Sequence, residues 1–250
     1  PVYCDPPAWS TQEGDGMLFL HETHKVVGSK EDEFEAAYRD QWMATMAESD
    51  DARLLWYANH AHGSGMSYQV VTITALADGR AWEDLAHRAR SGDLQDWMRE
   101  VDTLRHDVEG KILMPLPWSP MQEVDLATVP ADGNEHELSM YMEDTMWPYD
   151  GKLQDYIDAC GSVYSKSLKV GASERLISIQ LALQPALGSA VRSEVTLMQK
   201  VHDASRLQHL LMSEIPLEMR KPGTWMHDAL AVRDQWESKL LRTSAWSPLY

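Results

Sequence analysis

Short runs of apolar residues, each about the length of a strand, recur along the chain with helical patterns between them. In residues 17–27 apolar and polar side chains partly alternate and many favour β-structure, which predicts a strand. Gly28 and Ser29 are then predicted to form a turn. Apolar positions next recur every three or four residues, which predicts an amphipathic helix up to about residue 49. Those apolar positions are Phe34, Ala37, Tyr38, Trp42 and Met46.

The chain then continues with a predicted hairpin and a helical region. Gly63 and Gly65 lie in the turn of the hairpin, where glycine is common. Gly92 separates the two predicted helices. The remaining elements are two strands, two helices and a short strand, over 52–62, 67–78, 80–91, 93–110 and 111–117. The predicted order is therefore strand, helix, strand, strand, helix, strand.

The same order recurs in the second half of the chain. The predicted elements there are a strand, a helix, two strands and a mostly helical region, over 137–146, 152–168, 174–184, 191–201 and 204–237, with a short strand near Lys239. The segments 97–120 and 225–248 align without a gap. The aligned identities are Trp97/Trp225, Met98/Met226, Arg105/Arg233, Glu109/Glu237, Lys111/Lys239, Leu113/Leu241 and Trp118/Trp246. Arg53-Leu54 also matches Arg175-Leu176, and Asp78 matches Asp203. The sequence therefore predicts two diverged copies of one unit.

This repeat predicts the division of the chain. We expect an N-terminal extension over 1–16, a first unit over 17–121 and a second unit over 136–250. The segment 122–135 contains Pro, Asp and Gly and is the predicted linker.

The element order of each unit is that of a ferredoxin-like fold, with an antiparallel sheet and both helices on one face. The uncovered face must pack on something, and the second copy is the obvious partner. On its topology, its unit length and its Trp- and Lys-containing unit ends, the chain resembles a tandem member of the dimeric α+β barrel superfamily, and more particularly NIPSNAP-like proteins. We expect an α+β protein whose two units form an intramolecular barrel.

The resemblance implies a broad range of functions. The superfamily includes cofactor-free monooxygenases, polyketide cyclases, lactone isomerases and haem enzymes similar to chlorite dismutase. It implies a small organic ligand or haem between sheet and helices. Fold alone does not choose among these activities.

Charge and composition exclude some partners. The formal net charge of −17 disfavours nucleic acid and anionic membranes, and the longest apolar runs are too short to span a bilayer. The first sixteen residues do not read as a secretory signal. Only Cys4 and Cys160 are present, which favours the cytoplasm. We expect a small-molecule partner, and a homodimer is optional because two copies in one chain can close the barrel.

Residues that are polar in one copy and apolar in the other are candidates for function, whereas shared residues such as Arg105 and Lys111 are interpreted as structural. In the alignment, His21, Glu22 and His24 lie opposite Tyr141, Met142 and Asp144, and Tyr57, Asn59 and His60 lie opposite Ile179, Leu181 and Ala182. The pattern predicts a functional site in the first copy.

Glu22 and His24 lie two residues apart on the first strand, so their side chains share one face. A carboxylate and an imidazole so placed can share a proton, and we predict that His24 is a general base oriented by Glu22. The predicted substrate-binding residues are His21, Trp56, Tyr57, Asn59 and His60. The predicted reaction is a cofactor-independent oxygenation, isomerisation or cyclisation of a small, largely apolar, aromatic or polyketide-like molecule.

Three alternatives stay open. His60 and His62 have a spacing that can suit a metal ion, but two ligands are too few, so no metal site is predicted. Haem with His24 or a helical His106 as axial ligand is a further alternative. The third is a small-molecule-binding or scaffolding protein without catalysis. An N-terminal Pro1 acting as a base is disfavoured because the sequence around it matches no tautomerase.

Overall fold

The computed structural model describes residues 16–164, 176–187 and 192–250 of the 250-residue chain. Pro1 and Cys4, as well as the C-terminal part of the predicted helix 152–168, lie outside the described residues. Among the described residues, no helix has the length and apolar character needed to cross a bilayer.

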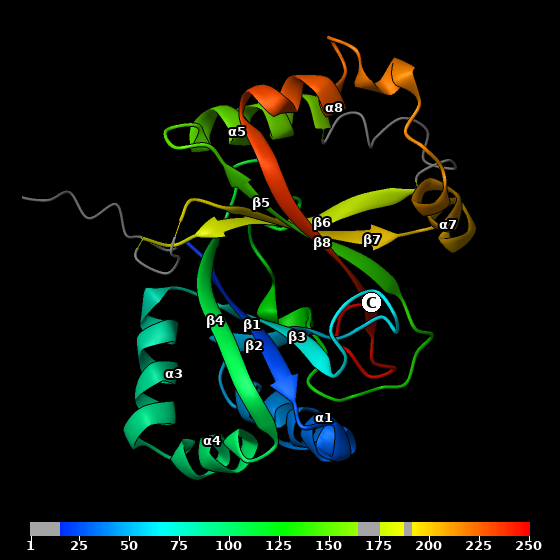
Figure 1. Ribbon diagram of the computed structural model, residues 1–250. Helices are drawn as coiled ribbons and strands as arrows, with labels where there is room; N and C mark the ends of the chain where they lie inside the picture. The colour runs from blue at the N-terminus through cyan, green and yellow to red at the C-terminus, as the bar shows by residue number, and fades with distance from the viewer. Residues whose placement is uncertain (1–15, 165–175, 188–191) are drawn as a thin grey trace, which may run out of the picture.

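Antiparallel strands form one closed barrel in the order β1-β3-β2-β8-β5-β7-β6-β4 (Figure 1). The strands of the first half are β1 Leu18–Val26, β2 Ala52–His60, β3 Gln69–Leu76 and β4 Arg105–Pro115. Those of the second half are β5 Met140–Pro148, β6 Ile177–Pro185, β7 Val195–Val201 and β8 Arg233–Thr243.

Helices cover the outside of the barrel (Figure 1). Those of the first half are η1 Gly28–Lys30, α1 Glu31–Ala36, η2 Ala37–Trp42, α2 Met43–Met46, α3 Gly79–Ser91 and α4 Gln95–Asp102. After η3 Leu126–Thr128, those of the second half are α5 Leu153–Ala159, η4 Cys160–Tyr164, α7 Ala204–Met212, η5 Leu217–Arg220, α8 Trp225–Asp228 and η6 Ala229–Ala231. Both η2 and η4 are π-helical.

Each half contributes a sheet of the same topology, β4-β1-β3-β2 and β8-β5-β7-β6. The sheets join edge to edge, because β2 pairs with β8 and β4 pairs with β6. This confirms the predicted α+β fold of two ferredoxin-like units in an intramolecular barrel. The paired edges make the two sheets continuous around the barrel.

Alternation along β1 divides its side chains between two environments. Phe19 belongs to the apolar core inside the barrel, whereas Leu20 packs against the core under the helices of the first half. His21 points into the barrel, where it meets Glu143 of the other half. Glu22 and His24 follow Leu20 on the helix-covered face, as the alternation predicted.

The boundaries of β4 and β8 correct a prediction. Residues 105–110 were expected to continue a helix, but β4 begins at Arg105, and β8 begins at the equivalent Arg233. The first residues of β4 pair with β1, where Arg105 lies opposite Val26. Cross-strand pairing in the barrel has overridden the local helical pattern.

Strand register also corrects the alignment of the two halves. Lys111 lies opposite His21, and the equivalent Lys239 lies opposite Glu143. His21 therefore corresponds to Glu143, and Glu22 corresponds to Asp144. Each match is shifted by two residues from the sequence alignment, which had matched Glu22 with Met142. The second half has thus kept a carboxylate at the position of Glu22.

The second strands are shifted as well. A β-bulge follows Leu54 in β2, and another follows Ile179 in β6. Leu54 therefore corresponds to Ile179, and the expected match of Leu54 with Leu176 was wrong. Tyr57 then corresponds to Ala182 and not to Ile179. By contrast, the match of Asp78 with Asp203 is confirmed, because each side chain caps the N-terminus of a helix.

Candidate functional site

A cavity of about 110 Å³ lies between the helix-covered face of the first sheet and helices η2, α3 and α4. Its apolar walls include Leu20, Trp42, Leu85, Ala86, Ala89 and Met98. This volume is below that of an apolar cavity of about 150 Å³ that holds benzene, so the space limits a ligand to about one ring. Trp82 of α3 is 44% exposed, and its ring lies at the edge of the cavity.

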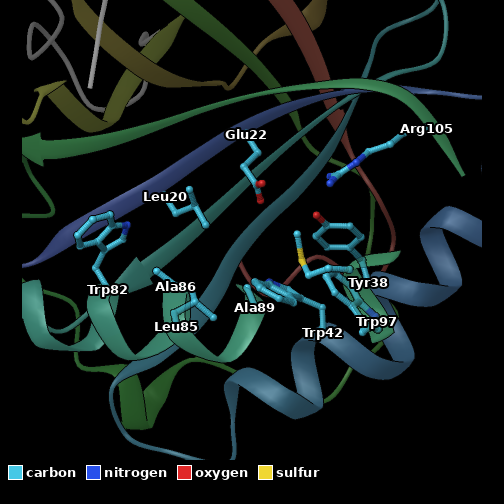
Figure 2. A pocket seen from close by; sticks show the side chains of 11 residues that line it. Leu20, Glu22, Tyr38, Trp42, Trp82, Leu85, Ala86, Ala89, Trp97 and Arg105 are labelled. Carbon is cyan, nitrogen blue, oxygen red and sulfur yellow. The ribbon is translucent and has the colours of Figure 1, made fainter. Parts of the chain in front are cut away.

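Glu22 brings a carboxyl group into this apolar space (Figure 2). Its side chain is only 15% exposed. Burial raises the pKa of Glu22 above its usual value, although Arg105, His21 and a hydrogen bond from Thr72 oppose the shift. A carboxyl group of this kind can change its protonation state nearer neutral pH, which suits general acid–base chemistry.

Tyr38 and Arg105 complete the polar side of the cavity. Figure 2 shows the Glu22 carboxylate, the Tyr38 hydroxyl and the Arg105 guanidinium converging on one side, above the wall of indole rings. Arg105 is held by Asp102, whose Oδ1 accepts from Nη2 at 2.6 Å. The guanidinium is therefore fixed before any ligand enters.

His24 lies behind these groups and is completely buried. Its Nδ1 accepts from Nη1 of Arg105 at 2.9 Å, since a guanidinium can only donate. The neutral ring therefore carries its hydrogen on Nε2, which lies 3.0 Å from Oγ1 of Thr72 and 3.2 Å from the Tyr38 hydroxyl. Burial, together with Arg105 and His21, lowers the pKa of His24 well below its usual value.

The structure thus places Glu22 and His24 together, with Oε2 and Nε2 3.9 Å apart. Only Glu22 lines the cavity. His24 has both ring nitrogens engaged and resists protonation, so its geometry favours a supporting place behind the carboxyl over the predicted one of general base.

Indole rings form the floor of the cavity. Trp97 stacks on Trp42 with ring centroids 4.6 Å apart, and its ring meets that of Tyr38 edge-on. Within the described residues, the buried Nε1 of Trp97 has no hydrogen-bond partner. A buried N–H without an acceptor is costly, and a ligand acceptor would satisfy it.

The predicted substrate-binding residues lie on two opposite faces of the sheet. Tyr57 and Asn59 share the helix-covered face, where Tyr57 packs on Tyr38 and Nδ2 of Asn59 donates to Ser244 at 3.4 Å. Trp56 belongs to the core inside the barrel. None of these three lines the first cavity.

His21 and His60 also lie away from the first cavity. His21 lines a second cavity, of about 150 Å³, inside the barrel between the two halves. His60 ends β2 and is half-buried; burial and the charge of Lys239 lower its pKa. The five residues predicted to bind substrate therefore do not surround one ligand.

The second cavity is polar and its buried charges are paired. Nε2 of His21 lies 2.7 Å from Oε2 of Glu143, and Lys239 approaches the other oxygen at 3.2 Å. Burial alone would raise the pKa of Glu143, but His21 and Lys239 together lower it to about 2. Lys111 pairs with Glu194 at 2.9 Å. These pairs join the two halves of the barrel.

Neither metal nor haem fits the groups present. Among the described residues, no three His, Cys, Asp or Glu side chains come together as metal ligands. His62 lies in an exposed turn beyond β2. His24 would have to break its bonds to Arg105 and Thr72 to bind iron, and the cavity is far smaller than a porphyrin. His106 is exposed on strand β4, which corrects its expected place in a helix.

Sequence reasoning missed several residues of the site. Arg105 was interpreted as structural because Arg233 matches it, yet it lines the cavity and fixes His24. Tyr38 was assigned only to the buried face of a helix, and Trp97 only to the repeat. The available signal was the placement of polar-tipped aromatic residues on helix faces that would cover Glu22.

No protein-family model matches the chain, and no curated protein matches it. Solved structures do match it. A structure described as a candidate monooxygenase from Fusobacterium nucleatum subsp. nucleatum covers 91% of this chain and 92% of its own, with a TM-score of 0.60 and 6% identity. The structure of an anthrone oxidase-like protein matches 93% of this chain and 92% of its own chain, with a TM-score of 0.58 and 8% identity.

A NIPSNAP family protein from Agrobacterium tumefaciens matches with 21% identity, covering 42% of this chain and 98% of its own, at a TM-score of 0.35. A likeness at so low a TM-score supports no argument about the chain. The two full-length likenesses show the fold alone.

Proposed function

We propose that the chain is an enzyme that acts on a neutral, largely apolar molecule of about one ring, bound between the first sheet and its helices. Glu22 is the group that takes a proton from the substrate. The pair of Glu22 and His24 predicted from the sequence is retained, with the roles exchanged: Glu22 transfers the proton, and His24 positions the groups around it.

One observation carries this proposal. The carboxyl group of Glu22 lies in a cavity with apolar walls, and burial raises its pKa. Large apolar pockets with a few convergent polar groups and a shifted pKa are the usual setting for acid–base catalysis. The second cavity lacks this combination, because the acids that line it, Glu109 and Glu237, are exposed.

The chemistry follows from the groups present. Ionised Glu22 would remove a proton from a carbon beside a carbonyl group, and Arg105 or the hydroxyl of Tyr38 would stabilise the enolate. Return of the proton to another atom is an isomerisation, and attack of the enolate on a second carbonyl of the same molecule is a cyclisation. Reaction of the enolate with dioxygen is an oxygenation; one protein of this fold is described as a candidate monooxygenase and another as anthrone oxidase-like.

Proton exchange with a small ketone tests the first step directly. Acetophenone in D₂O loses its methyl proton signal when a base enolises it, and proton NMR follows the rate. We expect Glu22→Gln to lower the enzyme-catalysed rate by about 100-fold to 10,000-fold, because the amide does not accept the proton. Glu109→Gln, at an exposed carboxylate of the other cavity, is the matched control and should exchange at the wild-type rate. Equal rates in Glu22→Gln and wild type would remove the proposed role.

A binding protein without catalysis is the second candidate, and the mostly apolar lining of the cavity supports it, since such a lining suits an apolar ligand whatever the chemistry. Tryptophan fluorescence reports binding because Trp42, Trp82 and Trp97 line the cavity. Quenching by acetophenone without proton exchange would favour this second candidate.

The site needs no second chain, since all its residues come from the first half and the barrel closes within one chain. A homodimer therefore remains a prediction that light scattering can test. The cytoplasmic location is likewise a prediction; the described Cys160 is a buried free thiol.

A further inference from the structure

Glu22 and Asp144 occupy equivalent positions, but hydrogen-bond donors surround them differently. In the second half, Ser238 lies across the strand pair from Asp144, and its hydroxyl donates to Oδ1 at 2.5 Å. Nε2 of Gln199 donates to Oδ2 at 2.8 Å. Both oxygens of Asp144 are therefore bound by neutral donors from the neighbouring strands.

The first half lacks both of these donors, and the donor it retains is the hydroxyl of Thr72, which lies opposite Glu22 on β3. Gly110 lies opposite Glu22, where Ser238 lies opposite Asp144. Register places Thr74 at the position of Gln199, since these residues pair with Leu54 and Ile179 at the bulges. The hydroxyl of Thr74 accepts a bond from Nε1 of Trp42 at 3.3 Å.

Backbone geometry does not demand a glycine at position 110. Its φ lies outside the left-handed region, and a Cβ built there would meet only Cγ of Glu22, at 3.8 Å, which is ordinary contact. A serine would therefore fit, with its hydroxyl within reach of the carboxyl group. The consequence of glycine at this position is therefore that no hydroxyl is present at position 110 to donate to Glu22.

Resting on the proposed function of Glu22, we propose that Gly110 is a positioning residue: it presents no cross-strand donor, so the Glu22 carboxyl turns into the cavity and accepts a proton from the ligand. Ser238 has the opposite effect on Asp144, where it binds the carboxylate to the sheet. One position on β4 and its counterpart on β8 thus separate a carboxyl group that faces the cavity from one that is bound to the sheet.

Other charged and titratable groups lie close enough to act on Glu22, four of them on its own side of the sheet and His21 on the opposite face of β1. They are His21 and His24 on β1, Tyr38 on η2, Asp102 at the end of α4 and Arg105 on β4. A substitution at Gly110 leaves all five in place. A change in the titration of Glu22 would therefore report the new hydroxyl.

The test compares Gly110→Ser with Gly110→Ala, which adds the same Cβ without a donor. Carbon-13 NMR of protein labelled at the glutamate side-chain carboxyl gives the pKa of Glu22, whose signal is assigned by its loss in Glu22→Gln. We expect Gly110→Ser to lower that pKa by about one pH unit, because a hydrogen bond to the ionised form favours it, and Gly110→Ala to leave it in place.

The same hydroxyl should act on turnover. In Gly110→Ser we expect the acid limb of the pH–rate profile for acetophenone exchange to move to lower pH by the same amount. The rate on the plateau should fall about tenfold, because the carboxylate becomes a weaker base. Gly110→Ala should keep the wild-type profile.

Identical titration of Glu22 in the serine and alanine variants would overturn this inference. Since the titration needs no substrate, that result would leave the Glu22→Gln test of the proposed function untouched. If circular dichroism shows that Gly110→Ser is unfolded, Ser238→Ala provides the reverse test: the pKa of Asp144, measured on protein labelled at the aspartate carboxyl, should rise, and an unchanged pKa would count against the inference.

Discussion

The two sheets have the same topology, but the carboxyl groups on their helix-covered faces have different surroundings. In the first half, Glu22 faces a cavity beneath α3 and α4. In the second, Asp144 is bound by Ser238 and Gln199, and Gln199 in turn accepts from the hydroxyl of Tyr164, which stacks on Trp225. A buried carboxyl group alone therefore does not make a functional site. Its hydrogen-bond donors and the presence of a cavity beside it determine whether it can reach a ligand.

Matched substitutions of the two carboxyls give the largest expected contrast. Glu22→Gln should lower acetophenone exchange at least 100-fold, whereas Asp144→Asn should change it less than twofold, since Asp144 has no part in the cavity. Both variants remove one buried carboxylate, so their folding controls are comparable. Equal losses of exchange would mean that the halves do not differ in the way proposed.

Inside the barrel the comparison concerns His21 and Glu143, which occupy equivalent positions and bind each other. The folded-state pKa of Glu143, about 2, lies below its unfolded value of 4.5. Its ion pairs therefore stabilise the fold above pH 4.5, and this stability is lost as pH falls through 2. We expect Glu143→Gln to cost roughly 3 kcal/mol at pH 7.

Urea denaturation at pH 7 and at pH 3 measures this effect. The difference between wild type and Glu143→Gln should be smaller at pH 3, where the unfolded chain has already bound the proton. The exposed Glu109, replaced by Gln, is the control and should show little difference at either pH. A cost that does not change with pH would mean that packing, and not charge, explains it.

The pair of equivalent arginines gives the next contrast. Arg105→Met leaves Nδ1 of His24 without its donor in a buried place, which should cost about 2 kcal/mol. Removal of this positive charge should also raise the pKa of His24, measured by proton NMR of the ring. Arg233 lies over the ring of Trp236 at 4.5 Å, and Arg233→Met should cost about 1 kcal/mol. A His24 pKa that does not rise in Arg105→Met would contradict the assigned effect of the guanidinium on the ring.

The repeat made the fold predictable from the sequence. Identical residues such as Trp97 and Trp225 indicated duplication, and the order of strands and helices indicated the ferredoxin-like unit. Alternation also placed Glu22 and His24 on one face correctly. These features depend on local periodicity, which the sequence carries directly.

The site was only partly predictable, because it depends on register. A shift of two residues on β1 hid the correspondence of Glu22 with Asp144, and it made the second half look more apolar than it is. Sequence alone also could not show that Arg105 would reach His24 from another strand. Register is set by pairing across the whole barrel, and bulges change it without an obvious sequence signal.

Two helix caps offer the smallest and most closely matched contrast. Asp78 accepts from the backbone N–H of Ala81 at the start of α3, and Asp203 accepts from that of Arg206 at the start of α7. Each replacement by Ala should cost about 1 kcal/mol, measured by urea denaturation.

Only Asp78→Ala should weaken the binding of the ligand. Helix α3 carries Leu85, Ala86 and Ala89 of the cavity wall, whereas α7 contributes nothing to that wall. Fraying of the first turn of α3 should therefore raise the KM for acetophenone by about twofold to threefold with little change in kcat, while Asp203→Ala leaves both unchanged. An equal change in KM in both variants would show that global stability, and not the wall of the cavity, controls binding.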